Sequence, residues 1–286
     1  MANLPLISTQ ASGSPATRCA TSANSKISGA AERRPGVSGT DRGAKALPPT
    51  AATSSEAKGA APGKIDFDDY SADYDELLRE STKLYAEDSE YFARYKVDLI
   101  RDAARGPIRR VLEYGCGTGR NIGYLQAAFP DARIVGTDVS AASLQVAAAN
   151  NPKAEFEVEG EGLELGAFDL IFVASVFHHI LPAERAAVMA TLARRLAQGG
   201  SINVFEHNPF NPVTRRIVST CPFDADAILL KPAELRSLLR HAGLHLQRQT
   251  YCLFVPPRLS WFLPVEKFLG WLPLGGQYWV SAGHAG

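Results

Sequence analysis

An acid and three glycines at alternate positions form the stretch of this sequence best suited to bind a ligand: Glu113, Gly115, Gly117 and Gly119. Residues 111–112 are apolar, and residues 122–129 carry apolar side chains at helical spacing, so the pattern predicts strand, tight turn and helix. Because glycine has no Cβ, a ligand can approach the backbone of such a turn closely. The free N–H groups at the start of the helix would face the same ligand. We therefore predict that a ligand lies on this turn.

The spacing of the turn argues against two common nucleotide sites. A dinucleotide site has the pattern G-x-G-x-x-G, and Arg120 stands where its last glycine would be. A P-loop needs Lys and then Ser or Thr after its last glycine, whereas Arg120 and Asn121 follow here. Glu113 would repel a pyrophosphate but attract an amino group.

A second acid narrows the choice of ligand. Residues 132–138 form a short apolar strand that ends in Asp138, 19 residues after Gly119. A carboxylate at the end of the second parallel strand can accept hydrogen bonds from both hydroxyls of a ribose. Together with Glu113, it points to adenosine linked to an amino acid.

Polar residues also follow two later strands. The apolar run 168–174 leads into Ser175, His178 and His179, and the strand 201–205 leads into a loop with Glu206, His207 and Asn208. Ligands bind outside the carboxyl ends of parallel strands, and imidazole titrates near neutral pH. We expect a second ligand here, although a helix start at 178–179 and a structural turn at 206–215 remain open alternatives.

With these motifs, the chain resembles the class I S-adenosylmethionine (SAM)-dependent methyltransferases of the small-molecule, type 11/12-like kind. The resemblance covers about residues 65–286 and rests on the glycine turn, on Asp138, and on residues 168–172 followed by 177–180. It implies SAM as the cofactor and no metal. The cofactor-binding residues it implies are Glu113 at the methionyl amino end, Gly115, Gly117 and Gly119 at the backbone, Asp138 at the ribose, Glu159 or the backbone beside it at the adenine, and Ser175. Glu161 competes with Glu159 for the adenine.

Residues at the strand ends, in the stretch before the first strand and in a later apolar segment are candidates to meet the methyl acceptor. The candidate catalytic residues are His178, His179 and His207. The candidate substrate contacts are Tyr70, Tyr74, Glu206, Asn208 and Trp261. Tyr70 and Tyr74 belong to an aromatic and acidic stretch that would fold over SAM as a lid, where a ring face attracts the sulfonium. Packing against an N-terminal helix is the alternative for both tyrosines.

The predicted fold class is α/β, a Rossmann-like doubly wound sheet of seven strands, mostly parallel with an antiparallel C-terminal strand. The residue pattern predicts a helix from Ser140 to Ala149, a strand at 154–158, a helix at 181–196 stopped by Gly199 and Gly200, and a helix at 232–242. Strands at 244–255 and 277–282 complete the sheet.

Composition sets the domain limits. Residues 1–63 lack aromatic side chains and apolar periodicity, which predicts a disordered extension, with a transit peptide or an early start codon as alternatives. Residues 64–286 form the methyltransferase domain, with an N-terminal lid at about 65–105. A net charge of zero argues against nucleic acid as a partner, and the four cysteines have neither zinc nor disulfide spacing. We expect a cytoplasmic protein.

An apolar insertion at about 256–274 carries Trp261, Phe268 and Trp271. Prolines and charges make it too short to span a bilayer. Three uses compete: a lid over an apolar acceptor, a peripheral membrane contact, or a homodimer contact.

The sequence therefore predicts methyl transfer from SAM to a hydrophobic small molecule, with O-methylation favoured. A fatty-acyl carboxylate, a lipid quinone precursor and an aromatic natural product are all open. The alternatives are a protein acceptor and a non-catalytic interaction protein that keeps the SAM fold.

Overall fold

A computed structural model describes residues 89–160, 162–221, 224–255 and 257–285. The predicted extension at 1–63, most of the predicted lid, and both Tyr70 and Tyr74 lie outside the described residues. Glu161, the competing adenine contact, lies outside them as well. The domain limits therefore stay predictions.

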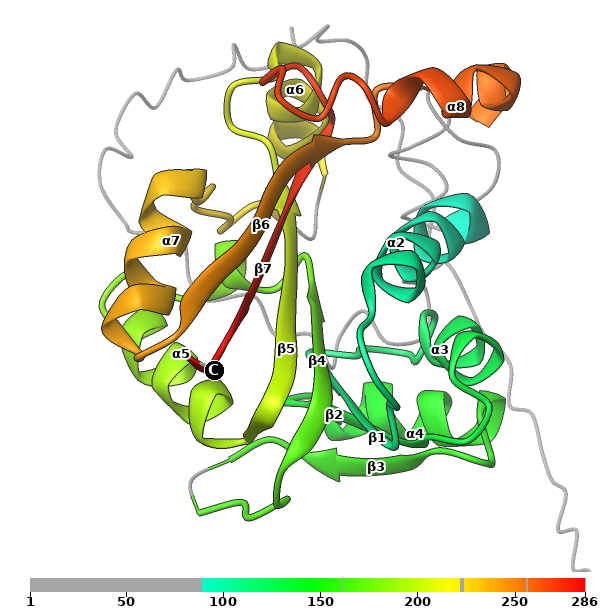
Figure 1. The fold of residues 1–286 in the computed structure, drawn as a ribbon, viewed down its shortest axis with the longest axis vertical. Helices are drawn as coiled ribbons and strands as arrows, with labels where there is room; N and C mark the ends of the chain where they lie inside the picture. Colours follow the sequence, from blue (N-terminus) through cyan, green and yellow to red (C-terminus); the bar gives the residue numbers. More distant parts are fainter. Residues whose placement is uncertain (1–88, 161, 222–223, 256, 286) are drawn as a thin grey trace, which may run out of the picture. The chain divides into compact units, whose positions relative to one another are not determined.

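The described chain builds one seven-stranded sheet in the order β3-β2-β1-β4-β5-β7-β6 (Figure 1). The strands are β1 (Arg110–Tyr114), β2 (Arg133–Asp138), β3 (Glu155–Val158), β4 (Phe168–Ala174), β5 (Leu196–His207), β6 (His245–Cys252) and β7 (Gln277–Gly283). Strands β1 to β5 are parallel, and β7 is inserted antiparallel between β5 and β6. The predicted fold class is confirmed.

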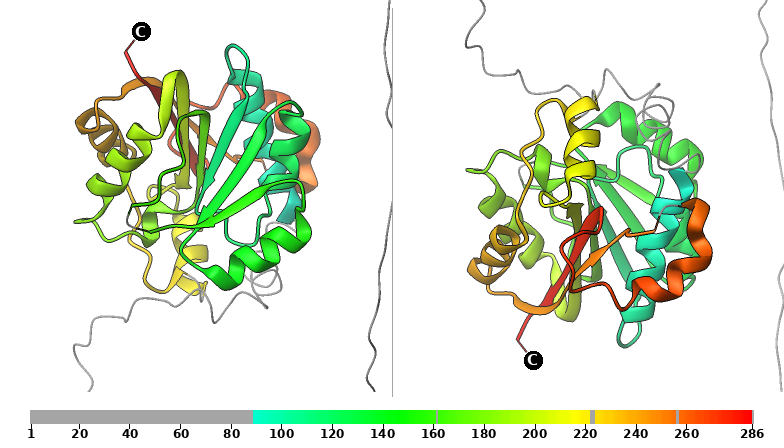
Figure 2. Two further views of the ribbon diagram at one scale, coloured as in Figure 1. Left: turned by 90° about the horizontal axis from the view of Figure 1, so that it is seen from below. Right: turned by 90° about the horizontal axis from the view of Figure 1, so that it is seen from above.

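Helices cover both faces of this sheet. Figure 2 shows α5 (Arg185–Arg194) and α7 (Pro232–His241) on one side and α2 (Ser89–Ala103), α3 (Ile122–Ala128) and α4 (Ala141–Asn150) on the other. Helix α6 (Pro212–Thr220) and the short α8 (Leu263–Glu266) lie near the end of the sheet where β5 finishes (Figure 1). A 3₁₀ turn, η2 (Phe177–His179), follows β4, and another, η4 (Pro257–Phe262), precedes α8.

Burial on both faces explains the continuous apolar runs of the central strands. In β4, Leu170 and Phe172 pack with the α2–α3 side, whereas Ile171 and Val173 pack with the α5–α7 side. All four are fully buried. A parallel strand covered on both faces needs apolar side chains in both directions. The carboxyl ends of β1, β2, β4 and β5 therefore meet at one rigid edge.

Two predicted boundaries were wrong. Helix α5 ends at Arg194, and β5 begins at Leu196, so Gly199 and Gly200 lie inside a strand and do not stop a helix. A Cβ on Gly200 would lie 2.9 Å from the carbonyl oxygen of Asp169, so close backbone approach explains this glycine. The loop after β5 also contains α6, which Asn211 caps by accepting from the amides of Val213 and Thr214.

The insertion folds into η4 and α8 and exposes its large side chains. Glu266 anchors it, because this buried carboxylate accepts from the Tyr95 hydroxyl at 2.7 Å and from the Phe254 amide at 3.0 Å. Trp261, Phe268 and Trp271 are 69%, 69% and 75% exposed. Among the described residues, no helix has the length and apolar character needed to cross a membrane.

Candidate active site

The three glycines of the turn after β1 have two different roles. Gly115, Gly117 and Gly119 have φ values of 70°, 52° and 78°, a region that other residues rarely adopt. A Cβ on Gly115 would lie 2.5 Å from a methyl group of Val176, and one on Gly119 would lie 3.0 Å from Cβ of Ala147. A Cβ on Gly117 would meet nothing within 4 Å. Close ligand approach was predicted for all three, but only Gly117 faces open space.

Asp138 fixes the turn against β2. Its Oδ2 accepts from the Gly117 amide at 2.8 Å, and its Oδ1 accepts from the Ser140 amide at 2.9 Å. An ionised carboxylate offers about four lone-pair positions, so it can accept further hydrogen bonds from a ribose. Ser140 in turn caps α4, as predicted, by accepting from the Ser143 amide at 3.0 Å.

Glu113 is a buried acid with one unused oxygen. It is 1% exposed, and its Oε1 accepts from the Asn121 side chain at 2.6 Å. Among the described residues, its Oε2 has no hydrogen-bond partner. Burial raises the pKa of Glu113 to about 8, although Asn121 and Lys96 oppose that shift. An orphaned buried oxygen of this kind fits the ammonium of a ligand, which would both pair with it and favour its ionised form.

These observations fit SAM. Glu113 would hold the amino end, the open backbone at Gly117 would lie against the ligand, and Asp138 would accept from the ribose. The predicted roles of Glu159 and Ser175 stay predictions. Both oxygens of Glu159 accept from Arg195, at 2.8 and 2.9 Å, which fixes the orientation of this side chain. Ser175 has a strained φ of 60°, and its hydroxyl accepts from Gln277 at 3.3 Å.

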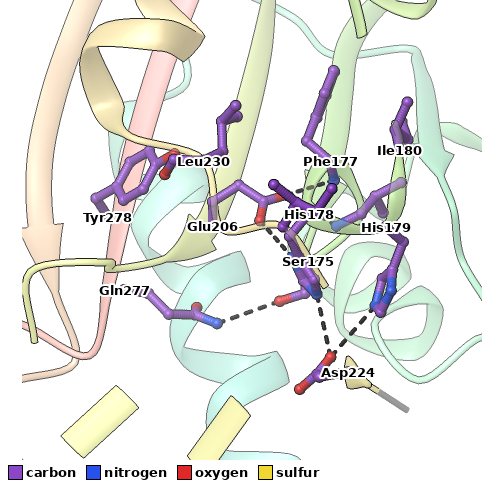
Figure 3. A network of polar contacts seen from close by, with 12 residues as sticks. Ser175, Phe177, His178, His179, Ile180, Glu206, Asp224, Leu230, Gln277 and Tyr278 are labelled. Carbon is purple, nitrogen blue, oxygen red and sulfur yellow. Dashed lines mark hydrogen bonds and ion pairs between the residues drawn. The ribbon is translucent and has the colours of Figure 1, made fainter. Parts of the chain in front are cut away.

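His178 and Glu206 form a buried imidazole–carboxylate pair at the ends of β4 and β5 (Figure 3). Nδ1 of His178 lies 2.7 Å from Oε2 of Glu206, and both side chains are 1% exposed. Oε1 of Glu206 accepts from the backbone amides of Val176 and Phe177, at 3.0 and 2.7 Å. Val176 is also the residue against which Gly115 packs. Val176 therefore contacts both the glycine turn and the carboxylate of the imidazole pair.

Asp224 joins both adjacent histidines. Its Oδ1 lies 3.4 Å from Nε2 of His178 and 3.5 Å from Nε2 of His179 (Figure 3). Nδ1 of His179 lies 3.2 Å from Oδ1 of Asp226. Burial alone would lower the pKa of His178, but Glu206 and Asp224 outweigh it and raise that pKa to about 9. Burial and then the charge of His178 lower the pKa of His179.

His207 belongs to the same cluster. Its ring centroid lies 4.8 Å from that of His178. Burial, followed by the charge of His178, lowers the pKa of His207 to about 4, so this ring is neutral at neutral pH. The structure therefore brings all three predicted histidines together.

Three predicted substrate contacts have other surroundings. Glu206 is buried, and its carboxylate is occupied by His178 and two amides, so it positions His178. Asn208 is fully buried; its amide donates to the carbonyls of Pro273 and Gly275, and its oxygen accepts from the Phe210 amide. These contacts make Asn208 a structural residue. Trp261 lies exposed against Phe262, with ring centroids 3.7 Å apart.

Sequence reasoning missed three residues of the site. Asp224 lies 45 residues after His179, in a stretch without a recognisable motif, and only the fold brings it to the cluster. Gln277 begins β7 and reaches Ser175 across 102 positions. Lys96 lies on α2, where burial lowers its pKa to about 8 while Glu113 opposes the shift. An isolated acid, amide or amine in the sequence gives no signal of such a role.

Comparisons with known proteins agree with this geometry. A family profile described as a methyltransferase domain matches residues 112–202. The trans-aconitate 2-methyltransferase of Methylobacterium nodulans is 30% identical over 139 residues, which cover 46% of this chain and 53% of that protein. The enzyme of the same name from Deinococcus radiodurans is 35% identical over 100 residues, covering 34% and 38%. The chain thus matches about half or less of the length of these curated relatives.

Solved structures share the fold at low identity. A TehB-like SAM-dependent methyltransferase from Corynebacterium glutamicum superposes with a TM-score of 0.52 at 17% identity, covering 76% of this chain and 99% of that one. A SAM-dependent methyltransferase from Archaeoglobus fulgidus gives 0.55 at 16%, covering 73% and 99%. The sheet and its glycine turn define a Rossmann-like methyltransferase fold. Together with the profile matched over residues 112–202, this likeness supports a class I SAM-dependent methyltransferase.

Proposed function

We propose that this protein transfers the methyl group of SAM to an oxygen of a small molecule with an apolar body. The single observation that carries the proposal is the adjacency of two sites. The glycine turn fits the donor, and Val176 joins it directly to the cluster of three histidines. Bound SAM supplies a methyl group on a positively charged sulfur, so the chain has mainly to orient the acceptor and exclude water.

The chemistry of the cluster favours a hydroxyl acceptor. Glu206 and Asp224 hold ionised carboxylates beside His178, because their contacts with that imidazole lower their pKa values despite burial. A second anion would be repelled there, whereas a hydroxyl can donate to a carboxylate or to a neutral imidazole nitrogen. This argues for an alcohol or phenol over a fatty-acyl carboxylate. The name of the trans-aconitate relatives supports a small-molecule acceptor in general.

Among the histidines, His179 is best placed to meet the acceptor. Both rings have a carboxylate at each nitrogen, but the side chain of His179 is 16% exposed, whereas that of His178 is 1% exposed. Losing a residue that handles the acceptor's proton typically reduces the rate by about 10²–10⁴-fold. His179→Gln should therefore lose turnover while retaining SAM affinity.

Incubation with methyl-labelled SAM tests the proposal. The acceptor panel would pair apolar phenols and alcohols with fatty acids of matched size, and the readouts would be S-adenosylhomocysteine release and label in the extracted acceptor. We expect label on hydroxyl compounds, reduced at least about 100-fold in His179→Gln. Label in precipitated protein would indicate the protein-acceptor alternative. SAM binding with no transfer to any acceptor would favour the non-catalytic alternative.

A further inference from the structure

We propose that His178, His179 and Asp224 bind a divalent transition-metal ion through Nε2 of each histidine and a carboxylate oxygen of Asp224. The three ligand atoms lie within 4.8 Å of one another. Oδ1 of Asp224 lies 3.4 and 3.5 Å from the two Nε2 atoms. Two ligands about 2.1 Å from a tetrahedral zinc ion are ~3.4 Å apart, so the two contacts with Asp224 have the spacing of one shared ion, and a separation near 4.8 Å would shorten when the ion binds.

The surroundings of Nδ1 in each ring also support a metal site. Nδ1 of His178 faces Glu206 at 2.7 Å, and Nδ1 of His179 faces Asp226 at 3.2 Å. A carboxylate at Nδ1 holds a proton there, so Nε2 becomes the metal ligand when a metal ion displaces any proton that Nε2 carries; this is the usual arrangement behind a metal-binding histidine. Both histidines have this arrangement, and both direct Nε2 at the same oxygen of Asp224 (Figure 3).

The ligand set indicates the class of metal. Two imidazoles and one carboxylate suit zinc, iron, cobalt or nickel, whereas calcium and magnesium prefer oxygen ligands. The side chains of Asp224 and His179 are 12% and 16% exposed, so an ion can reach the site. Three protein ligands leave at least one position for water or for an oxygen of the acceptor. Metal binding itself does not depend on the proposed methyl transfer.

Titration of the untagged, chelator-treated full chain with Zn²⁺ in the absence of SAM tests the site. We expect one ion per chain, retained in millimolar Mg²⁺. Asp224→Asn and His179→Gln should each weaken binding at least about 100-fold, and Asp226→Asn about 10–100-fold. His245→Gln removes an exposed histidine of β6 and serves as the matched control, with unchanged affinity.

A readout on the unmodified protein covers the case in which variants fail to fold. The chain has six histidines, and in ¹⁵N-histidine spectra Zn²⁺ should shift Nε2 of two of them. Absence of one-to-one binding, binding that Mg²⁺ displaces, equal affinity in folded Asp224→Asn, or shifts outside His178 and His179 would each overturn the proposal. Because SAM is absent, failure here leaves the methyltransferase proposal standing.

Discussion

His178 and Glu206 share a buried contact of 2.7 Å between Nδ1 and Oε2, and the same carboxylate accepts from two backbone amides after β4. Glu206→Gln would keep the shape of this side chain but replace one acceptor with an NH₂ donor. His178 would then accept at Nδ1 and carry its proton on Nε2, directed at Asp224. We predict a fall of about 10–100-fold in turnover and in Zn²⁺ affinity with unchanged SAM affinity.

Steady-state kinetics and calorimetry on Glu206→Gln check this, with the exposed Glu164→Gln as the control. A purely structural role for Glu206 would lower the melting temperature and weaken SAM binding in parallel. Normal turnover in a folded Glu206→Gln protein would contradict the positioning role.

Gly115 and Gly117 should respond differently to alanine. Gly117→Ala adds a methyl group to open space and should cost only about 1–2 kcal/mol of folding free energy, for its φ of 52°, while weakening SAM binding. Gly115→Ala collides with Val176 and should destabilise the protein more. Thermal unfolding and SAM titration of both variants check this. Val176→Ala should partly restore the stability of Gly115→Ala; no restoration would remove Val176 as the cause.

Glu113 should make stability depend on pH. Its folded-state pKa is raised from 4.5 to about 8, so between these values the native protein keeps a proton that the unfolded chain has lost. The free energy of unfolding therefore falls as pH rises through this window. Glu113→Gln should remove that fall and gain on the order of 1 kcal/mol or more at pH 8 in the ligand-free protein.

The same variant should bind SAM at least about 10-fold more weakly, since a neutral amide cannot pair with the ammonium as a carboxylate does. Denaturant unfolding at pH 5, 6.5 and 8 and SAM titration together check both effects. Equal pH slopes in wild type and Glu113→Gln would show that another group controls this window.

Substitutions at exposed and at buried residues of the insertion should change the free energy of unfolding by different amounts. Phe268→Ser and Trp271→Ser change side chains that are 69% and 75% exposed and should alter stability by only about 0.5 kcal/mol. Glu266→Ala removes the acceptor for Tyr95 and the Phe254 amide and should cost about 1–3 kcal/mol. Chemical unfolding checks the contrast.

The two serine variants also separate the predicted uses of the insertion. A raised KM for apolar acceptors would indicate that the insertion is a lid. Loss of binding to lipid vesicles would indicate a membrane contact. Loss of a dimer in sedimentation would indicate a homodimer contact. A large stability loss in either variant would show that the exposed side chains are part of the core packing.

The sequence predicts the fold well, and the predicted donor turn has a geometry that fits SAM, because both depend on local patterns. The apolar runs of β1, β2 and β4, the glycine spacing and the position of Asp138 are all visible within short windows. The C-terminal end of α5 was misjudged because Gly199 and Gly200 resemble a helix stop, whereas Gly200 serves a close approach to the Asp169 carbonyl.

The residues of the acceptor site could not be predicted from local sequence patterns in the same way. His178 and His179 were visible at the end of β4, but their partners Glu206, Asp224 and Asp226 come from two later segments. No metal-ligand spacing exists in the sequence because Asp224 reaches the histidines only through tertiary packing. The polarity of Asn208 predicts a substrate contact. In the structure its side chain is buried, and its amide donates hydrogen bonds to the carbonyls of residues 273 and 275.

Calorimetric titration of the full chain with SAM and S-adenosylhomocysteine, repeated on Asp138→Asn and on the exposed control Asp131→Asn, tests the central claim most directly. The account predicts one-to-one binding of both ligands. Affinity should drop at least about 10-fold in Asp138→Asn, where a carboxylate contact to the ribose is weakened, and stay unchanged in Asp131→Asn. Failure of the folded wild-type protein to bind either ligand, or equal affinity in Asp138→Asn, would contradict a SAM site built on the glycine turn and Asp138.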